Sequence, residues 1–224
     1  MVVLAHRGAG WHEGKLRENT LDAFKLAHKM KADGIETDIR ITKDNKLVLY
    51  HGKSIDGRAI EDMKHNEICD AAGYKVTLLE ELLNWAPKKF MLNIEIKHKN
   101  AICKAAEVIK AFKGKRYLVT SFWHSAAAHV AKVCDIEYGV LMSCRPIFIK
   151  PFLQLLPVHT NHIVWDYNVY DYELTSTLAN FQHIVYNAGD EEPEKVDGVI
   201  SDNIDIHLNQ KRTYKRYRSK KVYK

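Results

Sequence analysis

Hydrophobic residues recur along the chain with two different periods, and the two kinds of segment alternate. Residues 90–97 follow the two-residue period of a β-strand, with one face made of Phe90, Leu92, Ile94 and Ile96. Residues 102–112 follow the period of three to four residues of a helix, with an apolar stripe of Ile102, Ala106, Ile109 and Phe112. The pattern therefore predicts a chain in which strands and helices alternate.

The same criteria assign most of the remaining chain. Strands are expected at residues 2–6, 35–41, 46–51, 90–97, 117–121, 137–142, 162–166, 183–186 and 198–201. Helices are expected from a cap at Asn19 or Thr20 to Gly34, at residues 78–85, 102–112, 125–134, 146–155 and 173–179, and after Asp202. These segments make eight strand–helix steps and one extra strand, with no Gly-, Ser- or Pro-rich linker. We therefore expect a single-domain α/β fold, a (β/α)8 TIM barrel, with functional side chains at the carboxyl ends of its strands.

The basic character of the chain comes from its last residues. The sequence of 224 residues contains 34 Lys and Arg against 28 Asp and Glu, a formal net charge of +6. Residues 211–224 hold eight of the basic residues and no acidic one, so residues 1–210 are slightly acidic. We expect residues 1–210 to form the barrel and residues 211–224 a basic tail. The tail is either a solubilising last helix, a frayed end or a weak contact for an anionic membrane, and nucleic-acid binding is not expected.

The sequence lacks the marks of a secreted or membrane-spanning protein. No apolar run approaches the roughly 20 residues of a transmembrane helix, and the first residues are too short and uncharged for a signal peptide. Four widely spaced cysteines include no Cys-x-x-Cys pair, which favours reduced, mostly packed thiols over a zinc site or disulfides. These features predict a cytoplasmic protein and leave its oligomeric state open.

Three carboxylates, Glu36, Asp38 and Glu95, lie on two of the expected strands. Side chains two residues apart on a strand point the same way, so Glu36 and Asp38 share a face, as do Glu95 and Lys97. Inside a barrel these carboxylates must be paired or bind a cation, because an isolated buried charge is costly. A set of oxygen ligands suits Mg²⁺ or Ca²⁺ without distinguishing them. The alternative is a salt-bridge network with Arg7 and Lys97, and we favour the metal.

Two histidines, His6 and His51, end expected strands. Imidazole titrates near neutral pH, so both are candidates for proton transfer. The other ten histidines are expected to be structural, because a lone histidine at a strand end or on a helix usually is.

Two cations accompany the carboxylates and histidines. Arg7 offers two parallel N–H groups to phosphate oxygens, and Lys97 offers a point charge. Glu18 and Asn19 precede the first helix, where Asn19 would cap the helix, contact a ligand, or do both. Carboxylates, cations and histidines in this arrangement suit the metal-assisted cleavage of a phosphodiester.

The order of these residues resembles a known family. The signature of the glycerophosphodiester phosphodiesterase family is similar to the run of His6-Arg7-Gly8, Glu18-Asn19-Thr20, Glu36-Thr37-Asp38, Thr42, Val48 and His51. Further blocks that resemble the family are Asn93-Ile94-Glu95-Ile96-Lys97, Thr120-Ser121-Phe122 and residues 196–202, so that the resemblance covers residues 2–203.

The resemblance implies a (β/α)8 barrel that hydrolyses glycerophosphodiesters to sn-glycerol 3-phosphate and an alcohol with one Mg²⁺ or Ca²⁺ ion. It implies these roles by position: Glu36, Asp38 and Glu95 as metal ligands, His6 and His51 as the acid–base pair, and Arg7, Lys97, Glu18 and Asn19 on the substrate. The enzyme would be a phosphoric diester hydrolase.

Three features depart from the family pattern and bear on the substrate range. Gly52 follows the second histidine in place of an aspartate, residues 185–188 replace a Trp-Thr-Val-Asn strand, and residues 52–76 form a short segment without a Thr-Gly-rich stretch. One alternative is a lysophospholipase-D-like phosphodiesterase that acts on lipid at a membrane surface and docks through its tail. Another is a barrel that binds a phosphorylated ligand without turnover. We favour hydrolysis, because a pure binder has little use for this set of carboxylates and histidines.

Overall fold

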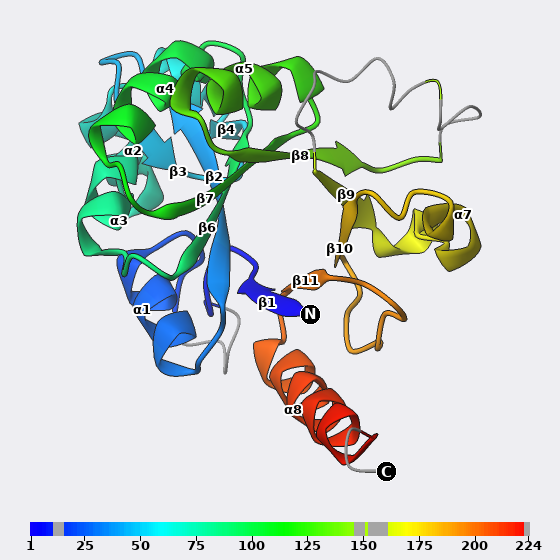
Figure 1. Ribbon diagram of the computed structural model, residues 1–224. Coiled ribbons are helices and arrows are strands. Elements are labelled where there is room, and N and C mark those ends of the chain that lie inside the picture. Colours follow the sequence, from blue (N-terminus) through cyan, green and yellow to red (C-terminus); the bar gives the residue numbers. More distant parts are fainter. Residues whose placement is uncertain (11–15, 146–150, 152–160, 222–224) are drawn as a thin grey trace.

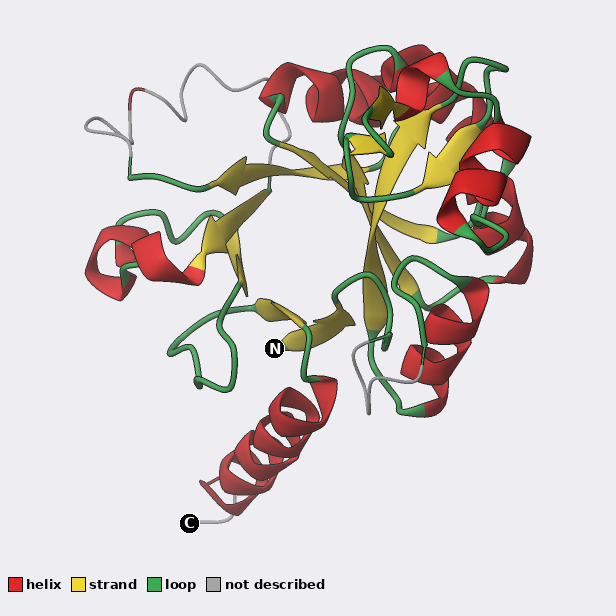
Figure 2. Cartoon of the chain, turned by 180° about the vertical axis from the view of Figure 1, so that it is seen from behind, coloured by secondary structure: helices red, strands yellow, loops and turns green. Residues whose placement is uncertain are grey.

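Eight parallel strands close into a barrel in a computed structural model, which describes residues 1–10, 16–145, 151 and 161–221 (Figures 1 and 2). The ring closes because β1 pairs with both β2 and β11. Around the ring the strands are β1 (Val2–Ala5), β2 (Gly34–Ile41), β6 (Met91–Ile96), β7 (Arg116–Ser121), β8 (Glu137–Met142), β9 (His162–Asp166), β10 (Gln182–Tyr186) and β11 (Gly198–Ser201). The single-domain (β/α)8 barrel expected from the sequence is confirmed.

Helices cover the outside of this ring (Figure 1). They are α1 (Leu21–Lys29), α3 (Leu79–Trp85), α4 (Ala101–Ala111), α5 (His124–Cys134), α7 (Tyr172–Ser176), with the 3₁₀ turn η3 (Tyr167–Val169) before it, and α8 (Ile204–Lys221). The main hydrophobic core lies between these helices and the strands. α7 is shorter than the helix expected at 173–179, and the helix expected at 146–155 falls almost wholly outside the described residues.

The extra strand and the segment after it form a small unit beside the barrel. β3 (Leu47–Leu49) runs antiparallel to the end of β2 and is shorter than the strand expected at 46–51. Residues 52–76, for which the sequence pattern predicted no element, contain β4 (Ser54–Ile55), β5 (Arg58–Ala59), η2 (Ile60–Asp62) and α2 (His65–Ala72). Buried residues of this unit form a core of their own, made of Val48, Ile60, Met63, Ile68 and Val76.

The barrel interior contains an apolar layer, and polar residues of β2 and β6 lie on its carboxyl side. Seven strands contribute to the apolar layer, with Leu4, Met91, Leu118, Leu141, Val164, Ile184 and Ile200. β2 contributes Gly34 at this level, where a Cβ would lie 2.2 Å from the carbonyl oxygen of Met91. The absence of a side chain at Gly34 therefore lets β2 and β6 lie close together, in a register that aligns Asp38 with Glu95.

The last helix, α8, contacts the barrel at its start and extends away from it toward its end (Figure 1). Its first turns pack on the barrel through buried Ile204, His207 and Leu208. Lys211 forms an ion pair with Asp33, which precedes β2 at the amino end of the barrel. Beyond this pair the helix projects away from the ring (Figures 1 and 2).

The proposed boundary between residues 210 and 211 lies inside α8, and the division into barrel and tail stays a prediction. Within the described part of the chain, no helix has both the length and the apolar character needed to cross a bilayer.

Candidate functional site

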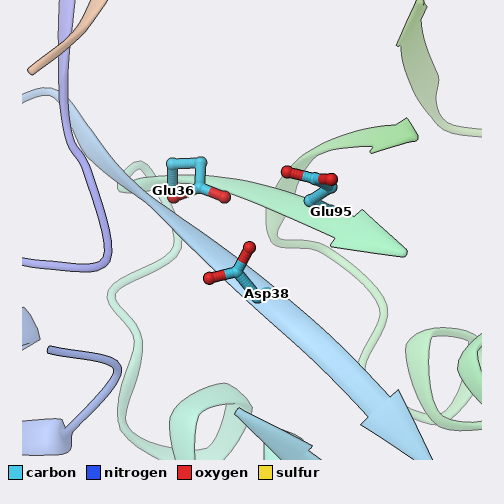
Figure 3. A group of neighbouring side chains, drawn as sticks. All are labelled: Glu36, Asp38 and Glu95. Atoms are coloured by element: carbon cyan, nitrogen blue, oxygen red, sulfur yellow. The ribbon is translucent and has the colours of Figure 1, made fainter. Parts of the chain in front are cut away.

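Three carboxylates from two neighbouring strands converge inside the barrel (Figure 3). Asp38 of β2 is paired in register with Glu95 of β6, and Glu36 lies two residues before Asp38 on the same face. One oxygen from each lies within 4.8 Å of the others. The three residues are between 1% and 8% exposed, so their charges are held away from water. The sequence prediction that these carboxylates come together is thus met by the structure.

Arg7 and Lys97 surround Asp38 but leave Glu36 less well paired. Lys97 Nζ lies 3.1 Å from Asp38 Oδ1 and 2.7 Å from Glu95 Oε1, and Arg7 Nε lies 3.4 Å from Asp38 Oδ2. Glu36 accepts a hydrogen bond from the backbone N–H of Arg7 at 3.2 Å. The carboxylates outnumber these two cations, which leaves a net negative charge that suits a further cation.

The excess of carboxylates over cations also affects the pKa values of the carboxylates. Burial raises the pKa of Glu36 to about 8, and the charges of Asp38 and Glu95 act in the same direction. Burial also raises the pKa of Glu95. For Asp38, burial opposes ionisation, but Lys97, the Asn19 amide and Arg7 together lower the pKa. A bound divalent cation would allow all three to ionise, and an oxygen-only donor set fits Mg²⁺ or Ca²⁺.

The loop between β1 and α1 supports Asp38 from the other side. The Asn19 amide donates to Asp38 Oδ2 at 3.0 Å, and its oxygen accepts from the Thr37 hydroxyl at 2.6 Å. Thr20 caps α1 by accepting from the N–H of Ala23, so the interpretation of Asn19 as the cap is wrong. Asn19 has a φ of +56°, a conformation that asparagine tolerates better than most residues. Its side chain therefore orients Asp38, a candidate metal ligand, instead of capping the helix.

Glu18 is placed beside Arg7 rather than beside the carboxylate cluster. Its Oε2 lies 3.0 Å from Nη1 of Arg7, and the two side chains are only partly exposed. Arg7 thus bridges Glu18 and Asp38, which fixes its guanidinium at the edge of the cluster. The expected contacts of Arg7, Lys97, Glu18 and Asn19 with a substrate stay predictions.

His6 is held by a residue to which sequence reasoning assigned no role. Its Nδ1 donates to Asp202 Oδ1 at 2.7 Å, and its Nε2 lies 3.8 Å from Glu36 Oε2. Burial lowers the pKa of His6, but Asp202 and Glu36 outweigh burial and raise it. Asp202 follows β11, which pairs with β1, so its signal in the sequence was its place directly after the closing strand.

His51 is in a different setting. It lies two residues beyond β3, and its ring forms no hydrogen bond with the described residues. Burial, with the nearby charges of Arg7 and Lys97, lowers its pKa, although Asp38 acts in the opposite direction. The pKa values of the two candidate proton carriers are therefore moved in opposite directions, a pattern that suits an acid and a base.

Two cavities have His51 in their lining. The smaller, about 180 Å³, is lined by Glu36, Glu95, Lys97 and both candidate histidines, with an apolar wall that includes Phe122 and Tyr186. The larger, about 550 Å³, lies between the loop before α1 and the unit formed by residues 52–76. His51 lines both.

Neither the described tryptophans nor the four cysteines line the smaller cavity. Trp165 is fully buried and donates from Nε1 to the His183 ring, Trp123 is exposed, and Trp11 lies outside the described residues. None of the described tryptophans lines the smaller cavity, where the aromatic residues are Phe122 and Tyr186. All four cysteines are free, but Cys103 and Cys144 are exposed, so the expectation of mostly packed thiols is wrong for half of them.

Known proteins are similar to this chain in sequence. Residues 6–135 match the model of the Glycerophosphoryl diester phosphodiesterase family. A glycerophosphodiester phosphodiesterase of Caldanaerobacter subterraneus is 33% identical over 166 residues, which are 64% of this chain and 67% of that protein. The chain spans about two thirds of the length of the first curated relatives that it matches.

Solved structures share the fold over nearly the whole chain. The glycerophosphodiester phosphodiesterase of Thermotoga maritima has a TM-score of 0.79 at 25% identity, covering 94% of this chain and 98% of its own. A phosphodiesterase of Oleispira antarctica, solved with the product sn-glycerol-3-phosphate, has a TM-score of 0.79 at 21% identity, covering 93% and 96%. At 21% identity, the similarity to the Oleispira antarctica protein shows a shared fold alone.

Proposed function

Because the chain belongs to the Glycerophosphoryl diester phosphodiesterase family, we propose that it hydrolyses glycerophosphodiesters to sn-glycerol 3-phosphate and an alcohol. The observation that carries this proposal is the buried cluster of Glu36, Asp38 and Glu95, of which Glu36 and Glu95 line one cavity together with both candidate histidines. The product named for the Oleispira antarctica protein is the product expected of this reaction and supports the proposal.

The three carboxylates would bind the cation, and Arg7 and Lys97 would bind the phosphodiester. Glu36, Asp38 and Glu95 would hold one Mg²⁺ or Ca²⁺ ion, which when bound supplies positive charge where negative charge develops on the phosphoryl group. Lys97 and Arg7 already lie within 3.4 Å of Asp38, so each can turn a free N–H toward a phosphoryl oxygen without leaving the cluster. Their charges orient the diester and stabilise the reaction's transition state.

His6 and His51 carry the protons. One histidine takes a proton from the nucleophile, which is either water or the 2-hydroxyl of the glycerol moiety. The other gives a proton to the departing alkoxide. Asp202 fixes the tautomer and the ring orientation of His6, because its carboxylate accepts from Nδ1 and leaves Nε2 toward the cavity. His51 has no such partner among the described residues, and Gly52 occupies the position where the family has an aspartate.

The proposal is tested by measuring sn-glycerol 3-phosphate released from choline, ethanolamine, glycerol and inositol diesters with Mg²⁺, with Ca²⁺ and with a chelator. His6→Ala and His51→Ala should each lower turnover by about 10²–10⁴-fold while metal binding, measured by calorimetry, stays intact. His129→Ala on the exposed face of α5 is the matched control. Metal-independent release, or unchanged turnover in both histidine variants, would contradict the mechanism.

The position of the basic tail favours a dissolved diester over a membrane lipid as the substrate. α8 begins beside Asp202 at the catalytic end, but Lys211 reaches Asp33 at the opposite end of the barrel, and the basic residues follow. A tail that docked on anionic lipid would therefore not bring the cavity mouth to the surface. Truncation after Arg212 should leave the kcat/KM for dissolved diesters within about twofold; activity on lysophospholipid vesicles that depended on the tail would favour the lipid substrate instead.

A further inference from the structure

The smaller cavity contains a buried polar side chain, Asn93 of β6, to which the proposed reaction gives no role. Asn93 lies two residues before Glu95 on the same face of β6 and is paired in register with Glu36 of β2. It is 0% exposed and lines the cavity that contains both candidate histidines. Met91, two residues nearer the amino end of β6, belongs to the apolar layer of the barrel interior. Asn93 is therefore the first polar side chain above that layer on this face of β6.

The amide of Asn93 is hydrogen-bonded through its oxygen but not through its nitrogen. Its Oδ1 accepts from the hydroxyl of Thr120, a residue of β7 that is also buried, at 2.8 Å. Its Nδ2 has no hydrogen-bond partner among the residues that the structure describes. A buried N–H group without an acceptor is costly, and most buried polar groups have a partner. A ligand atom that accepts from Nδ2 would remove this cost, because the group already faces the cavity.

The charged groups of the cavity favour an uncharged oxygen as the atom that accepts from Nδ2. Glu36 and Glu95 line the same cavity, so an oxygen with negative charge would lie near their carboxylates. In the proposed reaction the phosphoryl oxygens bind instead to Arg7 and Lys97, which lie past the carboxyl ends of β1 and β6. A hydroxyl group can accept from Nδ2 and donate to a carboxylate oxygen, so it suits both kinds of neighbour.

The glycerol arm of the proposed substrate carries such a hydroxyl group at its end. Leu141 and Ile200 of the apolar layer line the same cavity and can contact the carbon atoms of this arm. With the phosphoryl group at Arg7 and Lys97, the hydroxyl farthest from phosphorus extends toward the apolar layer, where Asn93 lies. Resting on the proposed hydrolysis, we propose that Asn93 Nδ2 donates to the terminal hydroxyl of the glycerol moiety. Asn93 is then a specificity-determining residue, which selects diesters in which this hydroxyl is present.

The test compares a glycerophosphodiester, of choline or of inositol, with its 1-deoxy analogue, in which a hydrogen atom replaces the terminal hydroxyl of the glycerol. Release of the alcohol is measured, because it is common to both compounds. Both also keep the 2-hydroxyl, so either nucleophile stays available. The native protein should have a kcat/KM for the diester roughly 10–100-fold above that for the analogue, because the analogue leaves the buried Nδ2 without an acceptor.

Substitution of Asn93 should remove this preference. Asn93→Ala should lower the kcat/KM for the diester by a similar factor and change that for the analogue little. Asn93→Leu combined with Thr120→Val replaces both partners of the hydrogen bond by apolar groups of similar shape, and it provides the same test if Asn93→Ala does not fold. Asn161→Ala is the matched control, because it removes an amide that is paired with Glu137 at the amino end of the barrel. It should keep the native preference.

The outcomes separate this proposal from the function on which it rests. If the Asn93 variants lower the kcat/KM for the diester and for the analogue equally, Asn93 has a structural role, and the proposal is overturned while hydrolysis stands. A native protein that does not distinguish the two compounds overturns it as well. No release of sn-glycerol 3-phosphate from any glycerophosphodiester, with Mg²⁺ or with Ca²⁺, would overturn both.

Discussion

The raised pKa of Glu36 makes a quantitative prediction about cation binding. A pKa moved from 4.5 to about 8 corresponds to roughly 5 kcal/mol of free energy opposing ionisation, at about 1.4 kcal/mol per pK unit. Because the cation binds the ionised carboxylate, it must displace the proton, and its apparent affinity falls as the pH falls below about 8. For one such proton the affinity for Mg²⁺ should rise roughly fiftyfold between about pH 6 and pH 8, then level off.

The free energy of unfolding of the metal-free protein should fall as the pH rises, whereas the affinity for the cation rises. A carboxyl group whose folded pKa lies above its unfolded pKa contributes most to stability below the unfolded value, and this contribution is lost as the pH rises through the folded pKa. Compared with Glu36→Gln, the metal-free native protein should therefore lose about 1.4 kcal/mol of unfolding free energy per pH unit between about pH 5 and pH 8. Saturating cation should remove this loss, because it stabilises the ionised form.

Calorimetric titration of Mg²⁺ in two buffers of different ionisation enthalpy measures the affinity and the proton released together. Denaturant unfolding with and without Mg²⁺ gives the stability. Glu36→Gln should weaken binding and abolish most of its pH dependence, whereas Glu107→Gln, an exposed residue of α4, should do neither. Displacement of a proton from Glu36 by the cation would be excluded by an affinity that is independent of pH, without proton release, or by an affinity that rises on acidification.

Three further predictions concern the support of the site. Asn19→Gly removes the amide that orients Asp38 without straining the positive φ, and should weaken metal affinity or activity by about 10–100-fold in calorimetric and kinetic assays. Asp202→Asn removes the carboxylate that raises the pKa of His6, so the limb of the pH–rate profile due to His6 should move to lower pH; an unmoved profile would exclude this role. Gly34→Ala places a Cβ against a carbonyl oxygen of β6 and should cost about 1–3 kcal/mol in denaturant unfolding, with reduced metal affinity; unchanged stability would show that the two strands separate freely.

Much of the fold was predictable because its signals are local. Alternating hydrophobic periods identify the strands and helices. Because strand–helix–strand connections are right-handed, the alternation places parallel strands side by side, as in a barrel. Glu36, Asp38 and Glu95 were predictable as a group because strand geometry fixes which side chains share a face, and the register of β2 and β6 brings them together. Arg7 and Lys97 were predictable in the same way, since Arg7 lies just past β1 and Lys97 just past β6.

Other features were not predictable because they depend on contacts between distant segments. The pairing of His6 with Asp202 joins residues at opposite ends of the chain and exists only once β1 and β11 close the ring. Asn19 and Thr20 have similar capping propensities, and the choice between them depends on the Asp38 carboxylate above the loop. The unit formed by residues 52–76 has two strands of two residues each, and its helix α2 buries Ile68 alone, so no apolar period marks it. The larger cavity that it borders was therefore also missed.

We expect Glu36, Asp38 and Glu95 to hold a divalent cation beside the phosphoryl group. Crystals grown with Mn²⁺ and sn-glycerol 3-phosphate would locate this cation by anomalous diffraction. One strong peak should lie about 2.0–2.6 Å from an oxygen of each carboxylate and from a phosphate oxygen, with Arg7 and Lys97 on the remaining phosphate oxygens. A peak elsewhere, or no peak in a protein that turns over glycerophosphodiesters, would contradict it.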